Sequence, residues 1–259
     1  MTTAYLGDQY SHSFAAVEKF GGDPVRYPTI RAALKAAADG KADRAVVPIE
    51  NSIEGSVRET LDGLYELPLY IVGEATLPIR QNLIGLDGAD LSKVRRVYSH
   101  PQALAQCRDF LEKLGAETVP VGSTSEGLAR IGDASEAAVA RVPRPGQTVI
   151  AGGIESGENA TRFVKVSGTP SFEGDKVSVA FETMNRPGAL LAALEVMRDF
   201  GLNMVKIESR PCRNGMGRYV FFADFTFGDG KEELMRILAA LGAKTSSLKF
   251  LGKYETEAL

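Results

Sequence analysis

Three short polar segments carry the side chains best suited to chemistry, and each joins an apolar run to an amphipathic one. The first contains Glu50, Asn51 and Ser52, and Ser56 with Glu59 then has the spacing of a capping box that opens a helix. A strand that delivers a polar loop to a helix N-terminus favours an anion, because free backbone N–H groups and the helix dipole both attract negative charge. The alternative is that these residues only build a turn and a cap.

The same arrangement recurs twice, after the apolar runs 94–98 and 118–121, and each time a serine begins a capping box. Three such junctions predict one polar cleft lined by helix N-termini, which would prefer a multiply anionic small molecule. His100 could donate a proton because imidazole titrates near neutrality, but its position before a proline favours a structural hydrogen bond. The candidates from these two junctions are Ser99, His100, Gln102, Ser123 and Thr124.

The overall composition excludes several classes of protein. A net charge of −3 over 259 residues and a pI near 5.6 give no sign of a nucleic-acid-binding surface. The sequence has no apolar run of about 18 residues and no signal-peptide pattern, so we expect a cytoplasmic protein with no membrane partner. Two cysteines and two histidines lack metal-ligand spacing, and no glycine-rich dinucleotide fingerprint occurs, so we expect neither a metal nor another cofactor.

The order of apolar and amphipathic segments predicts two α/β lobes with mainly parallel sheets. A β-α-β-α-β order begins near the first residue, and the strand-helix order starts afresh from residue 90. The extended stretch 69–79 is the expected crossing strand between the lobes, and 148–154 with 160–166 is the expected return. A cleft between two such lobes suits a small ligand. The expected bounds are about 1–75 and 152–168 for lobe one, about 76–151 for lobe two, strands at 2–6, 44–47, 94–98, 117–121 and 137–140, and helices at 14–20, 30–38 (capped by Thr29), 101–114 and 125–131.

A turn-rich linker at 169–175 precedes a segment with a different pattern. From residue 176 to 259 the order is β-α-β-β-α-β, which is the ferredoxin-like plan and predicts a separate domain. The expected elements are strands 176–183, 203–210, 218–226 and 246–254, helices 189–200 and 231–241, and a turn at 213–217.

Five sequence blocks in a fixed order resemble prephenate dehydratase followed by an ACT regulatory domain, and the resemblance covers nearly the whole chain. It implies a two-lobed, periplasmic-binding-protein-like (type II) catalytic domain over 1–168 and an ACT domain over 176–259. The blocks are Pro48-Ile49-Glu50-Asn51-Ser52-Ile53-Glu54-Gly55-Ser56, Ser99-His100-Pro101-Gln102-Ala103-Leu104, Asn159-Ala160-Thr161-Arg162-Phe163, Arg186-Pro187-Gly188-Ala189-Leu190 and Ile207-Glu208-Ser209-Arg210-Pro211.

The resemblance implies conversion of prephenate to phenylpyruvate, water and carbon dioxide, with feedback by L-phenylalanine at the ACT domain and assembly as a homodimer or homotetramer. Prephenate is a dianion, which suits the expected anion-binding cleft. Aromatisation drives the reaction, so the site must orient the substrate and assist the departing oxygen. The alternatives are arogenate as substrate, decarboxylation without aromatisation, or a non-catalytic amino-acid-binding sensor.

In the third block, the resemblance makes Thr161 the hydrogen-bond donor to the departing hydroxyl. Arg162 could bind a carboxylate, or be a structural ion-pair partner, since strand alternation points it away from the face of Thr161. Phe163 belongs either to the core or against the substrate ring. By the same resemblance, Asn51 and Ser52 bind a carboxylate, and Glu50 holds the loop in shape. The substrate-lining residues expected besides these are Ser99, Gln102, Ser123, Thr124, Asn159 and Ser11.

The chain departs from the family pattern in two places. The family opens with Leu-Gly-Pro-x-Gly-Thr-Phe/Tyr-Ser, whereas this chain has Leu6-Gly7-Asp8-Gln9-Tyr10-Ser11-His12-Ser13, so Ser11 or Ser13 would replace the missing hydroxyl. The stretch Pro143-Arg144-Pro145-Gly146 is also shorter than its counterpart in the family.

For the ACT domain, Gly188 and the backbone at Ala189 and Leu190 would receive the carboxylate of the effector at a helix N-terminus. The facing side of the pocket would be shaped from the next strand. The alternative is that Arg210-Pro211 merely ends an edge strand. The effector residues expected on that strand are Asn203, Glu208, Ser209, Arg210 and Pro211.

Overall fold

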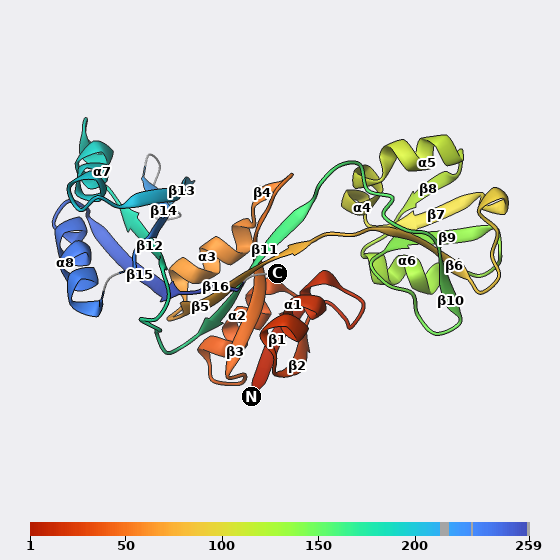
Figure 1. The fold of residues 1–259 in the computed structure, drawn as a ribbon, viewed down its shortest axis with the longest axis horizontal. Helices are drawn as coiled ribbons and strands as arrows, with labels where there is room; N and C mark the ends of the chain where they lie inside the picture. The colour runs from red at the N-terminus through yellow and green to blue at the C-terminus, as the bar shows by residue number, and fades with distance from the viewer. Residues whose placement is uncertain (213–217, 229, 258–259) are drawn as a thin grey trace.

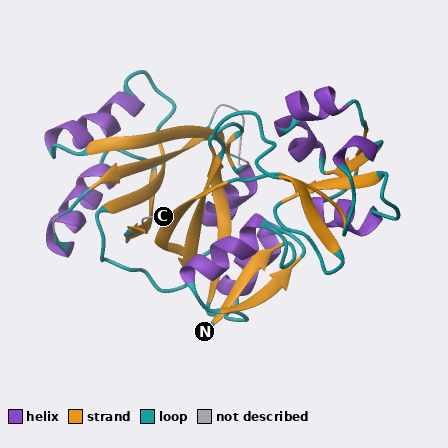
Figure 2. Ribbon diagram, turned by 45° about the vertical axis from the view of Figure 1, so that its right-hand side comes forward, coloured by secondary structure: helices purple, strands orange, loops and turns teal. Residues whose placement is uncertain are grey.

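A computed structural model describes residues 1–212, 218–228 and 230–257, and these residues form three β-sheets with helices (Figure 1). The predicted turn at 213–217 lies outside the described residues. Two lobes and a C-terminal domain each contain one sheet (Figure 2). Within the described part of the chain, no helix is both long enough and apolar enough to cross a membrane.

The first lobe is built on a seven-stranded sheet, as counted over the described residues, in the order β16-β5-β11-β3-β1-β2 with β4 beside β3. Helix α2 is alanine-rich and is capped by Thr29, whose hydroxyl accepts from the Ala32 N–H at 3.0 Å, as predicted. Helices α2 and α3 pack in the main apolar core, and α1 packs in a second cluster around Phe163. The elements are β1 (Thr2–Leu6), α1 (His12–Phe20), β2 (Asp23–Tyr27), α2 (Ile30–Ala38), β3 (Arg44–Asn51), β4 (Gly55–Ser56), α3 (Arg58–Glu66), β5 (Tyr70–Pro78), β11 (Ala160–Ser167) and β16 (Thr256–Glu257).

The second lobe contains a five-stranded sheet in the order β10-β6-β9-β7-β8, again within the described residues. The single helix predicted over 101–114 is wrong, because the backbone at Cys107 has φ −108° and ψ 15° and divides it in two. The buried Cys107 side chain packs in the core of the lobe. The elements are β6 (Asn82–Leu86), a short 3-10 helix (Leu91–Lys93), β7 (Arg96–Ser99), α4 (Pro101–Gln106), α5 (Arg108–Leu114), β8 (Glu117–Pro120), α6 (Thr124–Arg130), β9 (Glu136–Ala140) and β10 (Gln147–Ala151).

Both sheets are mixed rather than mainly parallel, through β11 in the first and through β6, which is antiparallel to β9 and β10, in the second. β1 is parallel to β2 and β3, and β7 is parallel to β8 and β9. β11, however, returns from the second lobe and therefore runs antiparallel to both β3 and β5. The pairing of β5 with β11 extends from Pro78 opposite Ala160 to Tyr70 opposite Ser167, so the two crossing strands support each other along their length (Figure 1).

The C-terminal domain follows the predicted β-α-β-β-α-β order, with its sheet in the order β13-β14-β12-β15. Helices α7 and α8 cover the face that points away from the first lobe, as Figure 2 shows. The opposite face contributes Ala180, Val220, Phe222 and Leu251 to the apolar core of the first lobe. The elements are β12 (Lys176–Glu182), α7 (Ala189–Asp199), β13 (Asn203–Pro211), β14 (Tyr219–Thr226), α8 (Lys231–Gly242) and β15 (Ser247–Tyr254).

Gly252 allows β15 to approach β5 closely, which gives the first prediction. Its φ is +143°, and a Cβ there would lie 2.1 Å from the Ile71 carbonyl oxygen. We expect Gly252→Ala to lower the free energy of unfolding by roughly 2 kcal/mol or more, because the backbones must separate. Gly168→Ala is the control, since a Cβ at Gly168 meets nothing within 4 Å. Urea unfolding of both variants tests this, and equal stability would contradict it.

Candidate active site

A cavity of about 710 Å³ lies between the two lobes and receives side chains from both. Eight of the predicted site residues line it, and five do not. The lining residues are Ser11, Asn51, His100, Gln102, Ser123, Thr124, Thr161 and Phe163. The five that the structure does not bring to the cavity wall are Glu50, Ser52, Ser99, Asn159 and Arg162.

Asn51 and Thr161 form the polar centre of the first-lobe wall. They lie opposite each other on β3 and β11, and the Asn51 amide nitrogen donates to the Thr161 hydroxyl at 2.9 Å. The Asn51 amide oxygen accepts from the N–H groups of Ile53 and Glu54 at 3.0 and 3.1 Å, which fixes the orientation of the amide. Since the Thr161 oxygen already accepts a hydrogen bond, its own proton can be donated to a group in the cavity.

Asn159 and Ser52 support this pair from behind the wall. The Asn51 amide also donates to the Asn159 side-chain oxygen at 2.7 Å. The Ser52 hydroxyl accepts from the Ala160 N–H at 3.0 Å, and the Ser52 N–H donates to the Ala160 carbonyl at 2.9 Å. These bonds fasten the loop after β3 to the start of β11, so both residues hold the polar loop in place.

Arg162 points to the opposite side of β11 from Thr161, as strand alternation predicts. Its guanidinium lies 2.8 Å from Asp224, 3.1 Å from Glu74 and 3.3 Å from Glu50. Burial alone would lower the pKa of Arg162, but the charges of Asp224 and Glu74 outweigh burial and raise the pKa. Of the two alternatives for Arg162, the structural ion pair is the arrangement found.

The serines at two of the predicted capping boxes do not cap helices. Ser99 ends β7, is fully buried and donates to the Val139 carbonyl at 2.6 Å, and His100 caps α4 instead by accepting from the Gln102 N–H at 3.3 Å. Ser56 lies in β4 and bonds to Lys206 and Glu208, while the N-cap of α3 is Val57. In both places the serine hydroxyl forms a hydrogen bond with a residue that is distant in sequence.

The third capping box is confirmed and places hydroxyls on the second-lobe wall. Ser123 caps α6, and its hydroxyl accepts from the Glu126 N–H at 3.0 Å. Ser123 and Thr124 then line the cavity together with His100 and Gln102 at the start of α4. The second lobe therefore presents donors and acceptors toward Thr161 and Asn51.

Among the lining residues that the sequence did not single out are His12, Arg26, Gln81 and Gln106. His12 is partly buried, and its Nε2 has no hydrogen-bond partner among the described residues. Burial, with a smaller contribution from the charge of Arg141, lowers the pKa of His12 to about 4. His12 is thus neutral at pH 7 in this structure.

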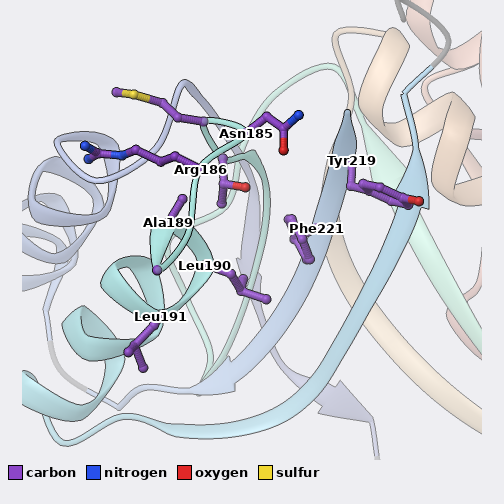
Figure 3. A pocket seen from close by; sticks show the side chains of 10 residues that line it. Asn185, Arg186, Ala189, Leu190, Leu191, Tyr219 and Phe221 are labelled. Carbon is purple, nitrogen blue, oxygen red and sulfur yellow. The ribbon is translucent and has the colours of Figure 1, made fainter. Parts of the chain in front are cut away.

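A second pocket, of about 500 Å³, lies in the C-terminal domain at the start of α7 (Figure 3). Gly188, Ala189 and Leu190 line it, as predicted for the effector site. Leu190 and Phe221 point toward each other across it in Figure 3. Five predicted effector residues do not line this pocket: Asn203, Glu208, Ser209, Arg210 and Pro211.

Arg210 and Pro211 line a separate pocket of about 270 Å³ that also contacts the first lobe. Arg210 pairs with Asp62 of α3 at 2.9 Å. β13 therefore contributes to the contact between the C-terminal domain and the first lobe, rather than to the pocket at α7.

The low pKa of His12 predicts an acid-sensitive contribution to stability. As pH falls from about 6.5 toward 4, the unfolded imidazole binds a proton before the folded one, so stability decreases over that interval and the change is complete below pH 4. We expect His12→Phe, which keeps a ring but removes the titrating group, to lose less stability over this range, by up to roughly 3 kcal/mol. Urea unfolding at pH 7, 5.5 and 4 measures this. Parallel pH curves for both proteins would contradict the assignment.

Comparison with known proteins identifies the family. The family model described as "Prephenate dehydratase" matches residues 3–171. The prephenate dehydratase of Methanocaldococcus jannaschii is 36% identical over 222 residues, covering 81% of this chain and 80% of the relative. The structure of prephenate dehydratase from Arthrobacter aurescens in complex with L-Phe superposes with a TM-score of 0.89 at 32% identity, covering 98% of this chain and 90% of that one.

A third similar protein shows that this fold alone does not define a reaction. The structure of GqqA, described as a novel type of quorum quenching acylase, superposes with a TM-score of 0.88 at 27% identity, covering 99% of this chain and 98% of that one. The family model, by contrast, matches more than half of the chain, and the dehydratase from Methanocaldococcus jannaschii is more similar in sequence. The chain therefore belongs to the prephenate dehydratase family.

Proposed function

We propose that this dehydratase converts prephenate to phenylpyruvate, water and carbon dioxide in the cavity between the lobes, beside Thr161. The observation that carries the proposal is the Asn51–Thr161 hydrogen bond at the cavity wall, which leaves the Thr161 proton available to a ligand. Both residues are 8% exposed, so this donor is held in a largely desolvated place, where a hydrogen bond to developing charge is strongest.

The reaction requires little acid or base strength from the protein. The bond between the ring and its carboxylate breaks, carbon dioxide leaves, and the electron pair completes the aromatic ring. The C–O bond at the 4-position breaks at the same time, and the departing oxygen takes up one proton to become water. Thr161 stabilises negative charge on that oxygen by donating a hydrogen bond, and the proton comes finally from solvent.

The rest of the cavity combines groups that attract an anion with two carboxylates. Arg26 contributes a positive charge, and the N-termini of α1, α4 and α6 contribute to the wall through Ser11, Gln102 and Ser123, whereas Asp8 and Glu54 add negative charge. Phe163 is 2% exposed and also lines the cavity, where its ring supports an apolar cyclohexadiene. These features fit a ring acid held between the two lobes.

Removing the Thr161 hydroxyl tests the catalytic role. We expect Thr161→Val to lower kcat for prephenate by about 100-fold with KM changed less than about threefold, because the lost bond matters most in the transition state. Thr169→Val, in the exposed linker, is the control and should behave like the parent protein. Near-normal turnover by Thr161→Val would show that Thr161 is not the hydrogen-bond donor to the departing oxygen.

The same assay separates the alternative activities. Products formed from prephenate and from arogenate can be identified by mass spectrometry. An aromatic product excludes decarboxylation without aromatisation, and the faster of the two substrates defines the preference. Binding of phenylalanine without turnover of either acid would favour the sensor alternative.

The C-terminal domain is the proposed ACT domain, with L-phenylalanine as its effector. The similar protein from Arthrobacter aurescens was solved in complex with L-Phe, and this supports the assignment. Gly188, with φ +78°, is the N-cap of α7, where free N–H groups favour a carboxylate, and Leu190 with Phe221 offers apolar contact for a ring. The edge strand β13 exposes Val205 and Ile207, which fits a homodimer or homotetramer.

Charge at the start of α7 should decide effector binding. We expect Gly188→Asp to weaken phenylalanine binding by at least about tenfold, because its carboxylate occupies the helix end and repels that of the ligand. Gly201→Asp is the matched control, since Gly201 lies just past the other end of α7 with a similar φ of +63°. Calorimetry measures both variants, and equal affinity would exclude this pocket as the effector site.

A further inference from the structure

The side chains of neighbouring residues on β3 and β11 point to opposite faces of the sheet. Asn51 and Thr161 are paired in register and face the cavity, whereas the next pair, Glu50 and Arg162, faces the C-terminal domain. The register of β11 against β3 shifts directly after this point, between Arg162 and Phe163. At such an irregularity a strand can bend and change the direction of its side chains. The catalytic candidate Thr161 is therefore one residue from a contact with another domain.

That contact is a charge cluster, named here the Arg162 cluster, in which each side complements the other. The first lobe contributes one cation and two carboxylates, and the C-terminal domain contributes two cations and two carboxylates. Each of the three cations pairs with a carboxylate on the other side of the contact, so separating the sides leaves these charges without those partners, which is costly where they are buried. The members are Arg162, Glu50 and Glu74 from the first lobe, and Asp224, Lys176, Lys206 and Glu208 from the C-terminal domain.

The centre of the cluster is buried, whereas Glu50 is 36% exposed and meets the Arg162 Nε at 3.3 Å as an ion pair without a hydrogen bond. The side chains of Arg162, Glu74 and Asp224 are 11%, 3% and 8% exposed. Lys176 lies 2.8 Å from Glu74, and Lys206 lies 2.9 Å from Glu50. Since ion pairs in such surroundings are poorly screened, a displacement of the carboxylate on β14 acts directly on the guanidinium on β11.

The strand that carries Asp224 also reaches the pocket at α7. β14 contributes Phe221 to that pocket, three residues before Asp224. Phe221 stacks on Phe181 of β12 with ring centroids 5.5 Å apart, and Asp224 accepts from Ser178 of the same strand at 2.6 Å. One rigid strand pair thus connects the pocket wall with the Arg162 cluster.

We propose that Arg162 is a positioning residue that makes the C-terminal sheet part of the support for Thr161. Asp224 fixes the position of the Arg162 guanidinium, which in turn pairs with the Glu50 carboxylate. These ion pairs fix β11 and β3, and the two strands place Thr161 and Asn51 at the cavity. A ligand that shifts β14 changes the position of Thr161 through this chain of ion pairs. The proposal rests on the proposed dehydratase function and on phenylalanine as effector.

The test variant is Asp224→Asn, which removes the charge while keeping the shape of the side chain. We expect kcat for prephenate to fall about tenfold with KM within about twofold, and saturating phenylalanine to lose most of its effect on turnover. The dissociation constant of phenylalanine, measured by calorimetry, should stay within about threefold. A merely structural role would lower stability without separating effector binding from its effect on turnover.

The matched control is Asp62→Asn, which also changes an acid in an ion pair between the first lobe and the C-terminal domain. Asp62 pairs with Arg210 at 2.9 Å and lies on α3 rather than on β3 or β11. We expect turnover and the response to phenylalanine to stay near those of the parent protein. Ser178→Ala, which removes the hydroxyl that donates to Asp224, should shift both in the same direction as Asp224→Asn but less.

Hydrogen exchange of the backbone amides at 160–167 gives a readout independent of the reaction. We expect faster exchange in Asp224→Asn and Ser178→Ala, but not in Asp62→Asn. Unchanged exchange and unchanged kcat in Asp224→Asn would overturn the proposal, as would equal effects in Asp62→Asn. If the parent protein makes no phenylpyruvate, the proposed function fails, whereas the exchange result still decides whether Asp224 positions β11.

Discussion

The hydrogen bond between Asn51 and Thr161 is the constraint on which the other features depend. It joins residues 110 positions apart in sequence, so β11 must return from the second lobe and lie against β3. That return makes β11 antiparallel to its neighbours and makes both connections between the lobes pass side by side as β5 and β11. The cavity is therefore built at the place where the chain leaves the first lobe and comes back, and its polar centre belongs to the returning strand.

Because side chains alternate along a β-strand, successive residues of β11 face different parts of the protein. Thr161 and Phe163 face the cavity side, and Arg162 between them faces the C-terminal domain. Both faces of β11 are covered by other parts of the protein. The same strand therefore carries the proposed catalytic residue and the contact with the C-terminal domain. Under the proposed role of Arg162, a change in the C-terminal sheet would alter the cavity through this strand, without any ligand crossing the intervening core.

Local pattern predicted the elements well and the partners of their polar residues less well. The helix capped by Thr29, the box at Ser123 and the β-α-β-β-α-β order depend on neighbours in sequence, and the structure has them. Ser56 and Ser99 have the same local signal, yet tertiary partners on β13 and β9 take their hydroxyls. Strand alternation predicted the direction of the Arg162 side chain, but its ion pair with Asp224 depends on the tertiary fold, because Asp224 lies on a distant strand. His12 and Arg26 carry no motif, so nothing in the sequence marked them.

The two stretches in which the sequence departs from the expected family pattern contact each other directly. Tyr10, where the family has glycine, packs its ring with the apolar cluster of the second lobe. Arg144, from the shortened stretch, lies over that ring at 5.3 Å, and Arg141 donates to the Tyr10 carbonyl at 3.4 Å. A glycine could make neither ring contact. Tyr10 thus anchors the first loop on the opposite lobe, and this anchor holds Ser11 and His12, which follow Tyr10 directly, at the cavity wall.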